Sequence, residues 1–170
     1  MTILKKNIKF LITLLILLAL SFHLNFSYAA GSSSGDDKDG VSLYKSGKKL
    51  VLRAKKLEKK DKIKKAKKLY LKAYDKFEKA YAKDKQNADI LNYLGYTLRK
   101  TGDFEKAETY YLQGLEMDPK HLGINEYLGE LYVQTGRIKL AKERLEVLKR
   151  CKCEEYEELR ELIEEKKDLY

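Results

Sequence analysis

Apolar residues recur every three or four positions along most of the chain beyond residue 46, and this is the period of one face of an α-helix. The longest stripe of this kind crosses a lysine-rich segment and consists of Ile63, Ala66, Tyr70, Ala73, Phe77, Ala80 and Tyr81. No segment alternates between apolar and polar residues, as a half-buried strand would. The pattern therefore predicts an all-α fold.

The apolar pattern also repeats at a fixed spacing of 34 residues. Six positions match across this spacing, namely Leu94, Gly95, Leu98, Gly102, Phe104 and Ala107 with Leu128, Gly129, Tyr132, Gly136, Ile138 and Ala141. The large residues form the buried stripe of a helix, the first glycine allows a partner helix to approach closely, and the second glycine ends the helix in a turn. Such a period is typical of a solenoid built from helical hairpins.

These positions resemble the tetratricopeptide repeat (TPR) family, whose helix–turn–helix unit follows the pattern W-x2-L-G-x2-Y…A-x3-F…P. Residues 88–121 match this pattern with Leu91 at the Trp place and Pro119 at the end. Residues 122–155 match it less fully, because Asn125 stands at the Trp place. The resemblance implies a solenoid of stacked helical hairpins.

The same region resembles small exported bacterial TPR proteins, which contain the segments L-G-x-N-E-Y-L-G-E-L-Y and C-E-E-Y. Here these segments run from Leu122 to Tyr132 and from Cys153 to Tyr156. This second resemblance implies an exported protein.

A further repeat precedes these two, although it does not align at the same spacing throughout. Its turn at residues 61–66 aligns with residues 102–107, whereas Phe77 aligns with Tyr111 at the usual spacing of 34. Both alignments hold if the second helix of this repeat is longer by seven residues, which is two turns and leaves the direction of the buried face unchanged. The sequence therefore predicts three repeats, at 47–87, 88–121 and 122–155, and a capping helix over 154–168.

Two segments precede the predicted TPR domain of residues 47–170. Residues 1–29 contain three lysines, then an apolar run, then small residues before Ala29, and this order predicts a secretory signal peptide. An uncleaved membrane anchor over residues 8–26 is the alternative, but the apolar run is shorter than the roughly 20 residues of a membrane span. Residues 30–46 begin with a stretch rich in Gly, Ser and Asp, and we expect them to form a flexible linker. We therefore expect an exported protein, with the periplasm as its compartment.

Charge is distributed unevenly along the chain. The formal net charge is +10, yet residues 45–85 carry 18 basic and 5 acidic residues, whereas residues 86–170 carry 14 basic and 18 acidic residues. Only six of the basic residues beyond residue 29 are arginines, which recognise bases and phosphates better than lysines do, so we expect no nucleic-acid partner. We expect the basic residues of this segment to form a solvated helical face. The alternative function is peripheral binding of anionic lipid or glycan through the helices of residues 45–85.

Little in the sequence points to catalysis. His121 is the single histidine beyond residue 29 and has no predicted partner, so we expect no enzyme and no cofactor. Cys151 and Cys153 leave three interpretations open, namely a disulfide, two packed or free thiols, and a metal or redox site. Because two thiolates supply only half of a tetrahedral shell, we expect no metal ion. A disulfide would need a break between helices at these residues.

The TPR resemblance supplies the candidate binding site. In that family, three places on the first helix of each repeat line a concave groove, and here they are Val51, Lys55, Glu58, Asn92, Tyr96, Arg99, Glu126, Glu130 and Val133. The set is mixed in charge and lacks the Lys-x-x-x-Asn arrangement of TPR proteins that clamp a terminal carboxylate. We therefore expect an adaptor that binds another protein or a peptide in this groove, with an oligomeric state that the sequence does not specify. A joint change of Tyr96 and Arg99 is expected to abolish binding without loss of helix.

Overall fold

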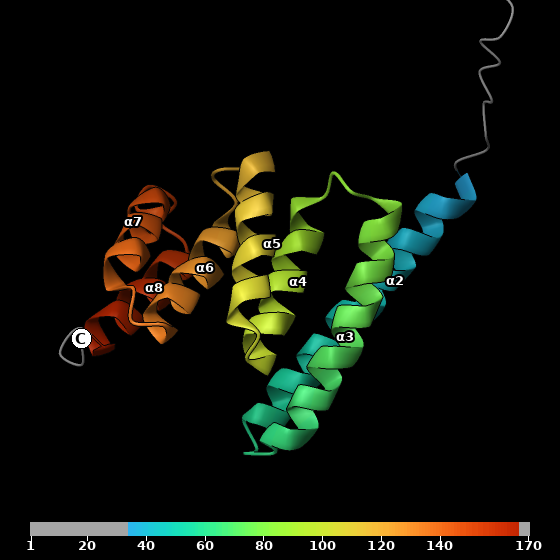
Figure 1. Ribbon diagram of the computed structural model, residues 1–170, viewed down its shortest axis with the longest axis horizontal. Coiled ribbons are helices and arrows are strands. Elements are labelled where there is room, and N and C mark those ends of the chain that lie inside the picture. Colours follow the sequence, from blue (N-terminus) through green and yellow to red (C-terminus); the bar gives the residue numbers. More distant parts are fainter. Residues whose placement is uncertain (1–33, 167–170) are drawn as a thin grey trace, which may run out of the picture. The chain divides into compact units, whose positions relative to one another are not determined.

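The computed structural model describes residues 34–166, so the predicted signal peptide over residues 1–29 lies outside the described residues. In this part of the chain seven α-helices follow one another, and no strand is present (Figure 1). The helices are α2 (Ser34–Glu58), α3 (Ile63–Lys83), α4 (Ala88–Thr101), α5 (Phe104–Met117), α6 (Leu122–Gln134), α7 (Ile138–Leu148) and α8 (Glu154–Lys166). None of the described helices is both long and apolar enough to cross a bilayer. The prediction of an all-α fold is confirmed.

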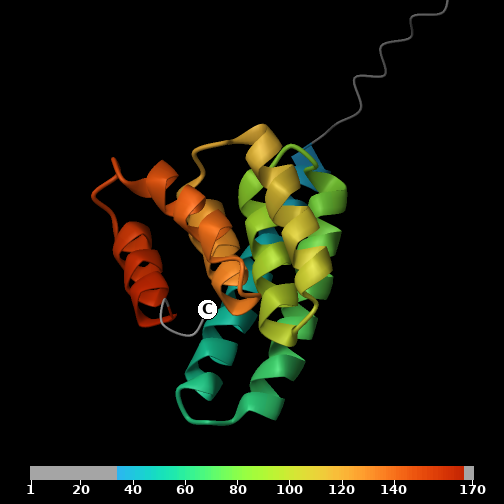
Figure 2. The same cartoon turned by 60° about the vertical axis from the view of Figure 1, so that its left-hand side comes forward.

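The first six helices pair as three hairpins, α2 with α3, α4 with α5, and α6 with α7. Consecutive hairpins pack through α3 against α4 and through α5 against α6, while α8 packs against both α6 and α7 (Figure 1, Figure 2). The second and third hairpins fall within residues 88–121 and 122–155, and α8 occupies the place expected for the capping helix. Stacked hairpins of this kind form the predicted solenoid.

Polar residues between the apolar stripes begin three of the helices. The side chains of Asn87, Asp103 and His121 accept hydrogen bonds from the backbone N–H three residues further on, at 3.2, 3.3 and 3.2 Å. These bonds satisfy N–H groups that have no partner within the helix. After α4 and α6, Gly102 and Gly136 adopt φ values of 101° and 74°, a left-handed conformation that glycine adopts most easily. The two glycines therefore end these helices, as the repeat pattern predicts.

The first helix begins earlier than the sequence indicated. Residues 34–46 belong to α2 and do not form the flexible linker expected for residues 30–46. The reason is the length of α3, which has 21 residues where α5 has 14, and this is the seven-residue difference expected from the repeats. Phe77 of α3 is completely buried. Tyr44 covers it with a ring centroid 5.9 Å away, so packing against α3 overrides the low helix propensity of the segment.

Close packing within the first two hairpins depends on a glycine opposite a ring. A Cβ atom on Gly47 would lie 2.6 Å from Cε1 of Phe77, and one on Gly95 would lie 2.5 Å from Cε1 of Tyr111. Both rings are completely buried. The rings therefore fill the space that a side chain would need, and each pair sets the separation of its two helices.

A disulfide joins Cys151 and Cys153 in the turn between α7 and α8, where the Cα atoms are 5.1 Å apart. Lys152, between them, has a φ of 51°, which interrupts the helical backbone. This is the break between helices that such a bridge requires. Of the three interpretations open from the sequence, the structure therefore contains the disulfide.

Gly95→Ala is expected to destabilise the protein by about 1–2 kcal/mol, although alanine favours a helix over glycine by about 1 kcal/mol. The added methyl group would meet three buried ring atoms of Tyr111 within 2.8 Å. Chemical denaturation followed by circular dichroism measures the change. Gly40→Ala is the matched control, because its Cβ would meet only the side chain of Lys83, at 3.2 Å or more, and should cost less. Equal or higher stability of Gly95→Ala would contradict the close contact.

Candidate functional site

Three adjoining cavities form one groove along α2, α4 and α6. The aromatic cavity is lined by Lys48, Val51, Leu52, Lys55, Tyr93, Tyr96 and Tyr127. The charged cavity is lined by Lys55, Glu58, Lys59, Tyr96, Arg99, Lys100, Tyr127, Glu130 and Glu158. The polar cavity, with a volume of about 520 Å³, is lined by Tyr44, Lys48, Asp89, Asn92, Tyr93, Asp118, Lys120, His121, Leu122, Gly123, Glu126, Tyr127 and Glu155. Tyr127 lines all three, so the cavities adjoin one another.

Tyrosine rings form the floor of the groove. The ring centroids of Tyr96 and Tyr127 lie 4.8 Å apart, and the Tyr93 ring stacks on Phe77 at 4.9 Å. Burial raises the pKa of the Tyr127 hydroxyl, as does the neighbouring Glu126 carboxylate. The hydroxyl therefore stays neutral and able to donate a hydrogen bond at physiological pH. A floor of this kind offers apolar area together with polar edges, which suits a binding surface.

Lysines of α2 form one wall of the groove and hold their charges over the tyrosine rings. The Nζ atom of Lys48 lies 5.6 Å from the centroid of Tyr93, and that of Lys55 lies 5.1 Å from the centroid of Tyr96. Leu52, between them in the sequence, is 59% exposed although it is apolar. The wall therefore presents an exposed leucine flanked by two positive charges.

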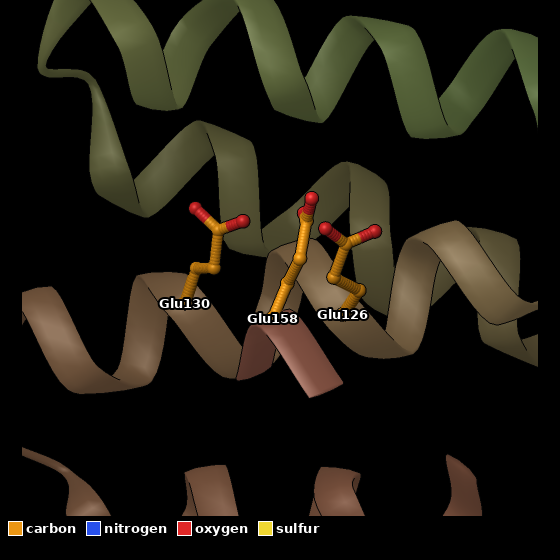
Figure 3. Close-up of side chains that lie close together, drawn as sticks. All are labelled: Glu126, Glu130 and Glu158. Carbon is orange, nitrogen blue, oxygen red and sulfur yellow. The ribbon is translucent and has the colours of Figure 1, made fainter. Parts of the chain in front are cut away.

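The opposite wall is acidic and comes from α6 and α8. The carboxylates of Glu126, Glu130 and Glu158 point the same way, and each contributes an oxygen within 4.8 Å of the others (Figure 3). Glu126 is buried and makes no ion pair with a basic residue in the described part of the chain. Burial, a hydrogen bond with Glu158 and the charge of Glu130 raise the pKa of Glu126 to about 9. Glu126 is therefore largely protonated at neutral pH.

One buried arginine crosses from α4 to this acidic wall. Nη1 of Arg99 lies 2.6 Å from Oε2 of Glu130, and the guanidinium lies 5.5 Å and 5.6 Å from the ring centroids of Tyr96 and Tyr127. Burial disfavours its charge, but the neighbouring Tyr111 and Glu130 outweigh that effect and raise the pKa of Arg99. Arg99 is therefore a permanent cation that holds α4 to α6.

Eight of the nine predicted groove residues line these cavities, and the ninth does not. Val133 is 2% exposed and belongs to the apolar core cluster that also contains Leu159 and Ile163 of α8. Five of the other eight are also buried, namely Val51, Asn92, Tyr96, Arg99 and Glu126. A joint change of Tyr96 and Arg99 would therefore disturb packing as well as binding, contrary to the expectation from the sequence.

Several lining residues were missed from the sequence. Tyr93 and Tyr127 stand 34 residues apart next to the leucine anchors, and this equivalence was the available signal. Glu155 and Glu158 come from α8, which lies outside the repeat pattern, so no repeat alignment could place them. Lys48 lies within the predicted first repeat but three residues before Val51, the first groove place of that repeat.

His121 has a structural role at the start of α6. Its Nδ1 accepts the hydrogen bond from the N–H of Ile124 that begins α6, and its Nε2 lies 3.2 Å from Oδ1 of Asp89. Both ring nitrogens are therefore engaged in holding α6 beside α4.

Glu126 should make stability fall as the pH rises. The folded state keeps a proton up to a pKa of about 9, whereas the unfolded chain releases it near the ordinary value of 4.5, so the stabilising protonation is lost between these values. The free energy of unfolding should decline by up to about 1.4 kcal/mol per pH unit more steeply in the wild type than in Glu126→Gln. Thermal unfolding at several pH values measures this, with the exposed Glu116→Gln as control. Parallel profiles of wild type and Glu126→Gln would contradict the raised pKa.

The comparisons with known proteins concern the repeats. The tetratricopeptide repeat family model matches residues 50–120. Human protein O-mannosyl-transferase TMTC3 is 33% identical over 70 residues, which make up 41% of this chain and 8% of that protein. The chain therefore spans a small part of the length of this curated relative.

Two solved structures share the arrangement of helices. The type III secretion chaperone SycD of Yersinia enterocolitica, in complex with a peptide of the translocator YopD, has a TM-score of 0.51 and 20% identity, and the match covers 72% of this chain and 92% of SycD. The first TPR of Spaghetti (RPAP3), bound to the HSP90 peptide SRMEEVD, has a TM-score of 0.50 and 19% identity, and the match covers 70% of this chain and 91% of that domain. At these identities the likeness concerns the fold. The chain therefore has the fold of a tetratricopeptide repeat solenoid, and its residues 50–120 match the model of that family.

Proposed function

We propose that this protein is a scaffold that binds a segment of another protein in the groove. The observation that carries the proposal is the aromatic cavity, where Leu52 is 59% exposed beside the partly exposed rings of Tyr93 and Tyr127. A partner that covers this leucine and the aromatic floor stabilises the complex by about 25 cal/mol per Å² of apolar surface buried. Lysines on one wall and carboxylates on the other would orient the bound segment and select its charges.

The solved relatives support a peptide or protein as the ligand. SycD is seen with a peptide of YopD, and the RPAP3 domain with the peptide SRMEEVD. An acidic peptide would need basic residues in the groove, whereas this wall consists of Glu126, Glu130 and Glu158. The proposed ligand is therefore a protein segment, but not an acidic chain terminus.

We propose in addition that the protein is exported to the periplasm. The disulfide between Cys151 and Cys153 supports an oxidising compartment, in which such bonds persist. The predicted cleavage after Ala29 would leave α2, which begins at Ser34, intact. Export and the intact helix are thus compatible.

Site-specific photo-crosslinking tests the binding function. A photoreactive amino acid in place of Leu52, in the full chain within its own organism, should yield discrete covalent adducts with one or a few proteins, identified by mass spectrometry. The same amino acid in place of Leu71, which is 52% exposed on α3 and lines none of the three cavities, is the control. In the captured complex, Leu52→Asp should weaken binding by at least about fivefold, the effect of losing about 1 kcal/mol of apolar contact. Equal adducts from both positions would exclude the groove as the binding site.

Intact mass spectrometry of the protein from its own organism tests export and the bridge together. The mass should correspond to a chain that begins at residue 30, and reduction should add about 2 Da as the two sulfurs gain hydrogen. The Cys151→Ser variant is the control for the second shift, because it cannot form the bridge. A mass that includes residues 1–29 would contradict cleavage, and an unchanged mass after reduction would contradict the bridge.

A further inference from the structure

We propose that the polar cavity binds a lysine or arginine side chain of the segment held in the groove, with Asn92 and Glu126 as the accepting groups. This inference rests on the proposed binding function and specifies the chemistry of the partner. It assigns a cation-binding role to one end of the groove.

The first observation is a buried amide oxygen without a partner. Asn92 is 6% exposed, lines the polar cavity, and its Oδ1 accepts no hydrogen bond within the described residues. The amide lies against Gly123 of α6, where a Cβ atom would come within 2.7 Å of Nδ2. An unpaired buried oxygen costs about 1–3 kcal/mol, so a donor that enters the cavity would recover this free energy.

The second observation is a carboxyl group without a cation. Glu126 lines the same cavity from α6 and has Glu130 and Glu158 beside it, with carboxylate oxygens within 4.8 Å. Arg99 satisfies Glu130 through a direct ion pair, but no described basic residue pairs with Glu126 or Glu158. Because no positive charge lies beside them, Glu126 and Glu158 share a proton in a hydrogen bond between their carboxyl groups.

The surrounding charges favour a cation over an anion. Asp89, Asp118 and Glu155 also line the polar cavity, together with Lys48, Lys120 and His121, whose Nε2 lies 3.2 Å from Oδ1 of Asp89. Lys48 is held over the rings of Tyr44 and Tyr93, with Nζ at 5.3 Å and 5.6 Å from their centroids. A net negative cavity with an orphan oxygen accepts a group that is positive and carries several N–H donors, which describes an ammonium or a guanidinium.

The position of Arg99 argues against a metal ion at these carboxylates. A divalent ion held by all three carboxylates would have to share Glu130 with a buried guanidinium only 2.6 Å away. A side-chain cation needs only Glu126 and Asn92, and it leaves the pair of Arg99 and Glu130 intact. The geometry therefore favours a basic side chain.

The test uses peptides selected on the full chain from a random phage-displayed library. Selected peptides are expected to share one lysine or arginine at a fixed distance from an apolar residue. Selection on Glu126→Gln should give peptides without that basic residue, because glutamine has the shape of the neutral acid but cannot release a proton to become charged when a cation enters. Glu116→Gln, on the exposed surface of α5, is the matched control and should select the same peptides as the wild type.

Calorimetry on one selected peptide then measures the contact. Glu126→Gln should weaken binding about 10- to 100-fold, and so should replacement of the peptide's arginine by citrulline, whereas both changes together should cost little more than either one. Asn92→Ala provides a second, uncharged probe and should weaken the arginine peptide more than the citrulline peptide. Thermal unfolding of each variant verifies that it is folded.

Three other outcomes are distinguishable. If no peptide is selected at all, the proposed binding function fails and this inference fails with it. If peptides are selected without a shared basic residue, the groove binds segments but the polar cavity is not a cation site. If CaCl2 or MnCl2 alone raises the melting temperature of the wild type and not of Glu126→Gln, the carboxylates hold a metal ion and the inference is overturned.

Discussion

The contact between a glycine and a buried aromatic ring sets the geometry on which the groove depends. Gly47 against Phe77 and Gly95 against Tyr111 draw the two helices of a hairpin together on one side. The first helices line the groove, where α4 presents Tyr93 and Tyr96. Larger residues at the two glycines would push the helices apart and move these tyrosines with them. The binding surface is therefore a product of the packing behind it.

The mixed charge of the groove follows from the uneven charge of the chain. The basic segment folds into α2 and α3, and α2 lends its lysines to one wall. The acidic end of the chain folds into α8, which returns to pack on α6 and adds Glu158 beside Glu126. Segments far apart in the sequence thus meet across a tyrosine floor with opposite charges. A bound segment would lie in an electric field directed across the groove, which favours one orientation over its reverse.

Most of the fold could be predicted from the sequence because repeats encode local and neighbouring contacts. The spacing of 34 residues gave the second and third hairpins, and two conflicting alignments gave the seven extra residues of α3. The early start of α2 could not be predicted from its composition, because it depends on covering Phe77 across the hairpin. The groove was predicted in part, since the family pattern gives helix positions but not their depth. It therefore included Val133, which is buried in the core, and omitted Glu158, which belongs to a helix without a repeat equivalent.

Tyr127 links occupancy of the groove to the stability of the fold. Its ring packs against both apolar clusters of the core, one built around α2 to α4 and the other around α5 to α8, and it also lines all three cavities. A ligand that rests on this ring therefore also holds together the two halves of the solenoid. By mass action, occupancy and resistance to unfolding must rise together, with an added stability of RT ln(1 + [L]/Kd). The empty protein is then the form most open to proteases, and the lifetime of the scaffold becomes linked to the supply of its partner.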